Sequence, residues 1–278
     1  MDIQLLAMDL DGTSLQADHL SFTPRLHQAL AEAHAKGVAI VPTTGRQHFL
    51  LPPPVQTGAA WENLCILCNG GEIRRIATGE LLRGHYIPPE VAQAVVELAG
   101  EYHFPVELSA QGHMYLTQES WDMEQPYREF IGYHLDVVLG KRGVVVDDLV
   151  RTAHTPELNI DKINLPHIPD PLRDQVCARL DALPLNHFWS GPHTIEIAHT
   201  QSTKGNALRE VCGLLDIDPA HVMAIGDSGN DLSMLQAAGF SVAMGNAAPH
   251  MQAAADAVTL PYDQDGAAIA IERYILNK

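Results

Sequence analysis

Residues 4–13, with the sequence QLLAMDLDGT, constrain the fold more than any other stretch of the chain. Residues 5–8 are uniformly apolar, which predicts a short strand that is buried on both faces. Asp9 and Asp11 follow at once, and residues two apart on an extended chain point the same way. We therefore expect both carboxylates to reach a ligand at the carboxyl end of this strand, where open parallel sheets bind their ligands.

Two neighbouring carboxylates repel each other, and a bound cation would remove that repulsion. The pattern of Asp9, Asp11 and Gly12 therefore indicates a metal site. Aspartate and glycine are also common in turns that bind nothing. This stretch alone leaves a polar turn as an equal alternative, and the rest of the chain must decide between the two.

The composition narrows the class of partner. The chain has 278 residues, of which 46% are hydrophobic, so it can form the core of one large domain or two smaller ones. Its formal net charge of -17 argues against a nucleic acid or a membrane surface as partner. With no leader sequence and no apolar run of membrane-spanning length, a soluble cytoplasmic protein is expected.

Strands and helices alternate through the first part of the chain. Residues 22–36 have helical spacing, whereas residues 38–41 and 64–67 are typical of buried strands. The first of these strands leads into residues 44–46, Thr-Gly-Arg, whose hydroxyl, amide and cation suit an anion such as phosphate. A capped loop is the alternative. The alternation predicts an α/β fold with a doubly wound parallel sheet and a ligand site along one edge.

The pattern changes after about residue 84. Helices there are mixed with short strands of antiparallel character, which is typical of an α+β module. We expect residues 85–190 to form an inserted α+β domain. Residues 1–84 and 191–278 are then expected to form one Rossmann-like core domain.

The strand–helix pattern returns near residue 202. Lys204 lies in the first turn of a predicted helix, where a cation is unfavourable, so an anion is expected nearby. A surface lysine is the alternative. A predicted strand over residues 221–225 leads into Asp227 and Asp231, which bring two more carboxylates to a strand end. Asp231 can instead cap the helix that follows.

Four motifs occur in the order that characterises one enzyme superfamily. They are Asp9-Leu10-Asp11-Gly12-Thr13, Thr44-Gly45-Arg46, Lys204 and Gly226-Asp227-Ser228-Gly229-Asn230-Asp231. Together they resemble the haloacid dehalogenase (HAD) superfamily of phosphohydrolases. The long insertion and residues 69–71, Asn-Gly-Gly, resemble its Cof-type branch, whose members carry a class IIB α/β cap and are often sugar-phosphate phosphatases. Thr203 stands where the family usually has serine.

The resemblance implies a role for each motif. Asp9 would attack phosphorus and form an aspartyl-phosphate, and Asp11 would act as general acid and then general base. The charge of Asp9 would favour a proton on Asp11. Mg²⁺ would lie between Asp9, the backbone carbonyl of Asp11, and Asp227, because hard oxygen ligands suit this ion.

The remaining motif residues would bind or support the phosphoryl group. Those expected to contact it, through side chains or backbone amides, are Leu10, Thr44, Gly45, Lys204 and Asn230. Arg46 and Asp231 would support the site. Within the inserted domain, substrate contacts are expected at His187, Trp189, His193 and Glu196.

The function implied is a Mg²⁺-dependent phosphatase that acts on small phosphorylated metabolites, with sugar phosphates the first expectation. A phosphomutase with the same core and a non-catalytic protein that binds phosphometabolites are the alternatives. The expected partner is a small-molecule phosphate monoester, with no nucleic acid and no membrane. The sequence leaves open whether the protein is a monomer or a homodimer, and it does not name the substrate.

Overall fold

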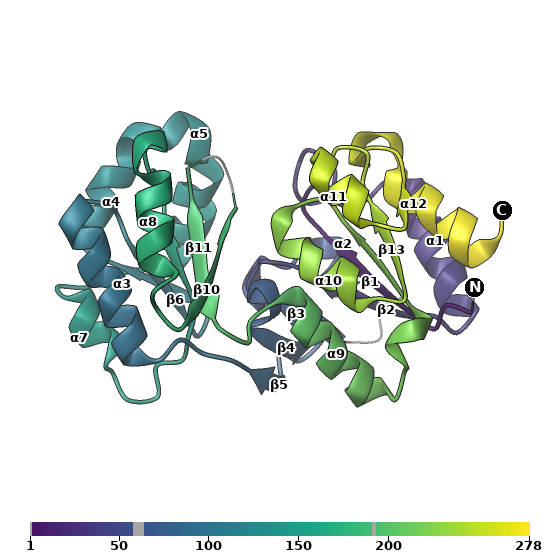
Figure 1. Cartoon of the computed structure of the whole chain (residues 1–278), viewed down its shortest axis with the longest axis horizontal. Coiled ribbons are helices and arrows are strands. Elements are labelled where there is room, and N and C mark those ends of the chain that lie inside the picture. Colours follow the sequence, from purple (N-terminus) through teal and green to yellow (C-terminus); the bar gives the residue numbers. More distant parts are fainter. Residues whose placement is uncertain (1, 58–63, 191–192) are drawn as a thin grey trace. The chain divides into compact units, whose positions relative to one another are not determined.

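The computed structural model describes residues 2–57, 64–190 and 193–278 (Figure 1). The chain divides into two compact units: Met1–Gly84 with Ser202–Lys278, and His85–Gln201. The insertion therefore ends at residue 201 and not at 190 as expected. The reason is that strand β11 (Ile195–His199) pairs with strands of the second unit.

An eight-stranded sheet organises the first unit, in the order β14-β13-β12-β1-β2-β3-β4-β5. The strands from β14 to β3 run parallel, whereas β4 and β5 are antiparallel additions at one edge. Their bounds are β1 (Leu5–Asp9), β2 (Ala39–Thr43), β3 (Leu64–Leu67), β4 (Glu72–Arg75), β5 (Leu81–Gly84), β12 (Val222–Gly226), β13 (Phe240–Ala243) and β14 (Ala257–Val258). The predicted α/β fold with a parallel-sheet core is confirmed.

Helices cover both faces of this sheet, which explains why its central strand is uniformly apolar. Leu6 and Met8 of β1 pack into one apolar cluster, and Leu5 and Ala7 into another. Residues of α1 (Pro24–Ala35) and α12 (Gly266–Ile271) join the first cluster, and residues of α9 (Lys204–Leu215), α10 (Leu232–Ala237) and α11 (Pro249–Ala254) join the second. A further short helix is α2 (Pro53–Thr57).

The second unit has a six-stranded sheet in the order β10-β11-β9-β6-β7-β8. Its other strands are β6 (Glu107–Ala110), β7 (His113–Leu116), β8 (Gly143–Val145), β9 (Ile160–Leu165) and β10 (Leu185–Trp189). Apolar residues of α3 (Pro89–Tyr102), α7 (Leu149–Ala153) and α8 (Arg173–Leu180) pack on one face of it (Figure 1). Shorter helices are α4 (Gln118–Glu124), α5 (Arg128–Tyr133) and α6 (Gly140–Arg142). Among the described residues, no helix has the length and apolar character needed to cross a bilayer.

A buried ion pair in the second unit should make its stability depend on pH. His134 Nε2 lies 2.6 Å from Glu107 Oε1. Burial disfavours the charged ring, but the charge and hydrogen bond of Glu107 outweigh it and raise the pKa of His134 above its ordinary 6.5. The pair therefore stabilises the folded state fully below pH 6.5, and this stabilisation is lost as the pH rises through the raised pKa.

We expect His134→Gln to lower the free energy of unfolding by roughly 1 kcal/mol at pH 6, and by less at pH 9. Glutamine keeps a hydrogen-bond donor but removes the charge, so the comparison isolates the ion pair. Urea unfolding at the two pH values measures the difference. The matched control is His154→Gln, at the exposed position directly after α7, where the ring lies 3.0 Å from the neutral Gln93 Oε1. A loss of the same size at both pH values would contradict the prediction.

Candidate active site

Three of the predicted motifs meet where neighbouring parallel strands end. Asp9 is the last residue of β1 and lies opposite Thr43, the last residue of β2. On the other side β1 pairs with β12, and Asp227 directly follows the last residue of β12. Because all three strands are parallel, their carboxyl ends share one edge of the sheet. The sequence motifs are therefore adjacent in space.

Lys204 joins two of the carboxylates at this edge. Thr203 is the N-cap of α9 and its hydroxyl accepts a hydrogen bond from the Asn206 amide, so threonine replaces the usual serine without loss of the cap. Lys204 is buried, and its Nζ donates to Asp9 Oδ1 and to Asp231 Oδ1, both at 2.6 Å. The anion expected beside this lysine is thus a pair of aspartates.

The buried Lys204 side chain is held in its charged form by its two aspartate partners. Burial disfavours the ammonium, but the charges and hydrogen bonds of Asp231 and Asp9 outweigh it and raise the pKa of Lys204. For Asp9, burial and the charge of Asp231 raise the pKa well above its ordinary value, although Lys204 opposes them. A neighbouring cation would therefore favour the ionised form of Asp9.

Asp231 holds the loop that carries Asp227. One oxygen of Asp231 faces Lys204, and the other accepts hydrogen bonds from the amides of Asp227 and Ser228, both at 3.0 Å. Asp231 is fully buried and closes a capping box at the start of the short helix Gly229–Asp231. The alternative that Asp231 caps the helix that follows is not confirmed, because its side chain makes no cap hydrogen bond to α10 and binds Lys204 and the preceding loop instead.

Asp227 is positioned by residues from two other loops. Thr13 Oγ1 donates to Asp227 Oδ1 at 3.0 Å, and Asn246 Nδ2 lies 3.3 Å from Asp227 Oδ2. Burial, followed by the charge of Asp231, raises the pKa of Asp227 to about 6. Gly12 has a φ of +76°, and a Cβ there would lie 2.5 Å from Asp227 Oδ2, so only glycine fits.

These carboxylates form a group that suits a metal ion. One oxygen each from Asp9, Asp227 and Asp231 lie within 4.8 Å of one another. Carboxylate oxygens are the donors preferred by hard divalent cations. Asp231 already accepts three hydrogen bonds, so Asp9 and Asp227 are the better candidates for direct ligands. The residues present therefore fit a divalent cation.

The side chain of Asp11 does not join this group. Arg46 clasps it through two hydrogen bonds, Nε to Oδ2 at 2.8 Å and Nη2 to Oδ1 at 2.6 Å, and His19 Nδ1 lies 2.9 Å from Oδ1. Burial alone would raise the pKa of Asp11, but Arg46 and His19 outweigh it and lower the pKa. In this structure the contacts of Arg46 and His19 therefore favour the ionised form of Asp11.

Comparison with known proteins assigns the family. A family model described as haloacid dehalogenase-like hydrolase matches residues 6–271. The chain belongs to the haloacid dehalogenase-like hydrolases. It is 32% identical to "Putative phosphatase YxeH" from Bacillus subtilis (strain 168), over 99% of both proteins. It is also 28% identical to the pyridoxal phosphate phosphatase YbhA from Escherichia coli (strain K12), over 93% of both.

Solved structures agree with this assignment. The HAD phosphatase BT1666 from Bacteroides thetaiotaomicron matches with a TM-score of 0.80 at 25% identity, covering 98% of this chain and 94% of that one. The resemblance to the Cof-type branch is thus confirmed, and this HAD-like hydrolase is a phosphatase of the phosphoric monoester class.

Further contacts in this HAD-like hydrolase surround the sheet edge. The Thr44 hydroxyl accepts from the Arg46 amide at 3.2 Å, and a Cβ on Gly45 would lie 2.9 Å from Asn69 Oδ1. Asn230 Nδ2 donates to that same Asn69 Oδ1 at 2.8 Å. Asn69, from the loop after β3, thus joins the second and fourth motifs. Its positive φ of 56° is typical of an asparagine in a tight turn.

The sequence did not predict every contact near the aspartate cluster. Leu10 is buried, and its carbonyl accepts the amides of Ser14 and Leu15, at 3.0 and 2.9 Å. Thr13 and Asn246 were not predicted as site residues. Thr13 belongs to the first motif, but the contact of Asn246 with Asp227 has no signal in the sequence.

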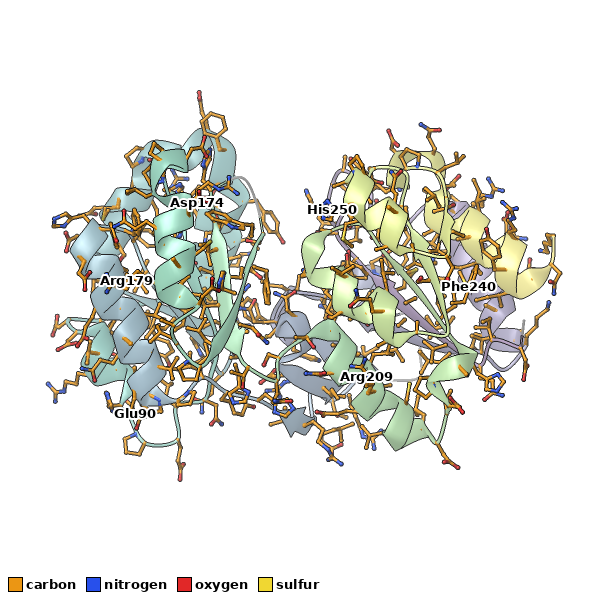
Figure 2. The ribbon with its side chains drawn as sticks, in the orientation of Figure 1. Glu90, Asp174, Arg179, Arg209, Phe240 and His250 are labelled. Carbon is orange, nitrogen blue, oxygen red and sulfur yellow. The ribbon has the colours of Figure 1, made fainter. Side chains whose placement is uncertain are left out.

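The four candidates in the second unit have partners of their own. His187 Nε2 lies 2.8 Å from Asp181 Oδ1, His193 Nδ1 lies 3.6 Å from Asp170 Oδ1, and Lys162 Nζ donates to Glu196 Oε1 at 2.8 Å. The guanidinium of Arg173 stacks on the Trp189 ring at 3.9 Å. Figure 2 shows Asp174, on the same helix as Arg173, among the side chains of this unit.

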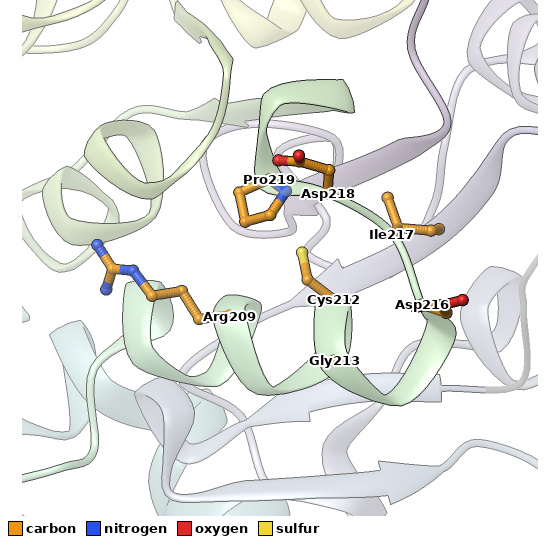
Figure 3. Close-up of a pocket in the computed structure, with 7 residues that line it drawn as sticks. All are labelled: Arg209, Cys212, Gly213, Asp216, Ile217, Asp218 and Pro219. Carbon is orange, nitrogen blue, oxygen red and sulfur yellow. The ribbon is translucent and has the colours of Figure 1, made fainter.

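A surface pocket of about 480 Å³ lies elsewhere on the first unit (Figure 3). It is formed by the C-terminal part of α9 and the loop that follows, and is lined by Arg209, Cys212, Gly213, Asp216, Ile217, Asp218 and Pro219. Lys204 opens the same helix, and a helix rises 1.5 Å per residue, so the lining residues Arg209 to Gly213 lie about 8 to 14 Å further along the axis. The pocket is therefore distinct from the aspartate cluster.

Proposed function

We propose that this protein is a Mg²⁺-dependent phosphatase that hydrolyses small phosphorylated metabolites, in particular sugar phosphates, through an aspartyl-phosphate intermediate. The observation that carries the proposal is the buried Lys204 ammonium, which lies 2.6 Å from both Asp9 and Asp231. This contact holds a carboxylate at a strand end beside a cation able to bind phosphoryl oxygens.

Asp9 and Asp227 would hold the metal ion, with the backbone carbonyl of Asp11 as the third protein ligand. When bound, Mg²⁺ would supply positive charge that offsets the aspartates and the phosphate dianion. Asp231 would keep Lys204 and the Asp227 loop in place. Asn246 and Thr13 would orient the Asp227 carboxylate through their hydrogen bonds.

The chemistry would proceed in two displacements. In the first, a carboxylate oxygen of Asp9 forms a bond to phosphorus as the ester P–O bond breaks, and Asp11 gives its proton to the leaving oxygen. In the second, Asp11 takes a proton from water, which attacks the aspartyl-phosphate and releases inorganic phosphate. Lys204, the Thr44 hydroxyl and the Gly45 amide bind the phosphoryl oxygens, with further contacts from the Leu10 amide and Asn230.

The contact between Arg46 and Asp11 affects the acid–base role proposed for Asp11. Since its contacts lower the pKa of Asp11, Asp11 would hold a proton more readily once it has moved away from Arg46. Arg46 would then act as the switch for Asp11, in addition to the supporting role suggested by its position. The second unit, residues 85–201, would serve as the cap that selects the leaving group.

The names of relatives support a small phosphorylated substrate without identifying it. YbhA is named for pyridoxal phosphate, and YcsE from Bacillus subtilis (strain 168), 27% identical, for 5-amino-6-(5-phospho-D-ribitylamino)uracil. These compounds share a phosphate monoester and differ in the alcohol. We extend only the shared part, a small phosphate monoester, to this chain.

Phosphate release from p-nitrophenyl phosphate tests the proposal and its dependence on metal. We expect turnover with Mg²⁺, loss of at least about 100-fold after treatment with EDTA, and recovery when excess Mg²⁺ is restored, because several kcal/mol of charge stabilisation depend on the ion. Equal turnover with and without EDTA would contradict the metal dependence. A phosphomutase or a non-catalytic binding protein would release no phosphate under any of these conditions.

A further inference from the structure

A loop over residues 16–21 follows the first motif and has no role in the two displacements proposed above. Its ends are joined by a hydrogen bond from the Gln16 amide to the Ser21 carbonyl at 2.9 Å. Within it, the Asp18 carboxylate accepts from the Ser21 amide at 2.9 Å and from the Ser21 hydroxyl at 2.6 Å. His19 has a φ of +56°, and its amide donates to the Gln16 carbonyl at 2.9 Å. The loop is therefore fixed by its own hydrogen bonds, and these hold His19 in place.

His19 contacts both partners of the clasp between Asp11 and Arg46. Its ring Nδ1 lies 2.9 Å from Asp11 Oδ1, the oxygen that also accepts from Arg46 Nη2 at 2.6 Å. The His19 carbonyl accepts from the same Nη2 at 3.0 Å. Because a carboxylate can only accept, the proton of the ring contact is on Nδ1, which is possible for a neutral ring as well as for a charged one. The contact therefore does not require a charge on His19.

The clasp occupies both oxygens of Asp11. Oδ2 accepts from Arg46 Nε at 2.8 Å, whereas Oδ1 accepts from Arg46 Nη2 and from the His19 ring. Arg46 is itself held in position, because its Nη1 donates to the Leu50 carbonyl at 3.0 Å and its Nη2 to the His19 carbonyl. An Asp11 oxygen that is bonded to these donors is less available to carry a proton to a leaving oxygen. Each donor of the clasp therefore lowers the share of molecules in which Asp11 can act.

We propose that His19 is a positioning residue for Asp11, which holds the carboxylate against Arg46 and so limits how often Asp11 is released to serve as general acid. The inference rests on the proposed function and deepens it, since the acid role of Asp11 is part of that function. Removal of the His19 ring would leave the two hydrogen bonds from Arg46. The share of released Asp11 should then rise about fivefold, which is the shift that one hydrogen bond of ordinary net strength produces.

Two leaving groups of different basicity test this role. Phenolate needs a proton from the general acid as it leaves phenyl phosphate, whereas p-nitrophenolate leaves p-nitrophenyl phosphate readily without one. In single turnovers with Mg²⁺ in excess, we expect His19→Gly to release phenol about fivefold faster than the wild type, and p-nitrophenol within about twofold of the wild-type rate. The phenyl phosphate concentration that gives half the maximal rate should not change, because the substitution acts on Asp11 and not on phosphate binding.

The backbone at residue 19 decides which variants are informative. Glycine and asparagine both tolerate the φ of +56°, so neither should strain the loop. Asparagine also carries a side-chain amide that can donate to Asp11 as the ring does, so His19→Asn should keep the wild-type rate on phenyl phosphate. The matched control is His103→Gly, which makes the glycine substitution at a φ of +55° directly after α3, and it should leave both rates unchanged.

A second measurement does not need turnover. The Arg46 Nε proton is donated to Asp11 Oδ2, so its exchange with solvent, followed by NMR, reports how often Asp11 leaves Arg46. We expect this exchange to be about fivefold faster in His19→Gly and unchanged in His19→Asn.

The outcomes separate this inference from the proposed function. Equal acceleration of both substrates by His19→Gly, acceleration of neither, or unchanged Arg46 exchange in that variant overturns the inference. A His19→Asn protein that behaves like His19→Gly does so too. Failure of the wild type to release phosphate from p-nitrophenyl phosphate would instead count against the proposed function, and the exchange measurement would still test whether His19 holds Asp11.

Discussion

Replacing Asp9 with asparagine is expected to reduce phosphate release by about 10⁵-fold, which is the scale of loss when a covalent nucleophile is removed. Asparagine has nearly the same shape as aspartate, but its amide cannot attack phosphorus. Lys204 keeps Asp231 as its charged partner in this variant, so the fold should persist. Release of inorganic phosphate from p-nitrophenyl phosphate, with Mg²⁺ in excess, measures the effect.

Two controls separate a chemical loss from a folding loss. Asp174→Asn makes the same substitution on α8 in the second unit (Figure 2) and should leave turnover unchanged. A single turnover of labelled substrate should label the wild-type protein and leave Asp9→Asn unlabelled, since no aspartyl-phosphate can form. If Asp9→Asn retained even a tenth of the wild-type turnover, the assignment of the nucleophile would be wrong.

Lys204→Met is expected to lower the free energy of unfolding by roughly 3–5 kcal/mol and to abolish turnover. Methionine approximates the length of lysine but carries no charge, so Asp9 and Asp231 would remain buried without their cation. Removing one partner of a buried ion pair is costly for this reason. Denaturant unfolding without added metal measures the stability of the first unit.

The source of this loss can be checked within the same network. Adding Asp231→Asn to Lys204→Met removes one of the two uncompensated charges, so the double variant should recover part of the stability. Lys141→Met, at an exposed position of α6, is the matched control and should change the free energy of unfolding little. An unchanged denaturation midpoint for Lys204→Met would show that the buried ion pair does not stabilise the fold.

Much of the aspartate cluster can be predicted from the sequence, because a small number of physical rules is enough to determine its position. A two-residue period, a parallel sheet and the position of each polar residue after an apolar run suffice to bring Asp9 and Asp227 together. Lys204 lies in the first turn of α9, and only the resemblance to the HAD superfamily predicted its place beside them. The clasp of Asp11 by Arg46 does not follow from those rules. It depends on how far one guanidinium extends from a neighbouring loop, and spacing along the chain carries no information about that.

The residue at which the insertion ends could not be predicted from the sequence either. Residues 195–199 alternate in polarity as an edge strand of either unit would, and only their pairing with β9 and β10 assigns them to the second sheet. The contact between Asn69 and Asn230 could not be predicted from the sequence for a similar reason. It joins two loops that are 161 residues apart in the chain, and each asparagine by itself is typical of a turn.

The central place of β1 has a consequence for how the protein is made. Its partner β12 begins at Val222, so during synthesis one side of the first strand stays unpaired until most of the chain has left the ribosome. The whole inserted unit can fold in that interval, because all six strands of its sheet lie within residues 85–201. An apolar strand with an open edge is prone to wrong pairing. We therefore expect nascent chains stalled before residue 222 to bind chaperones, because the inserted unit is folded while β1 still lacks its partner β12.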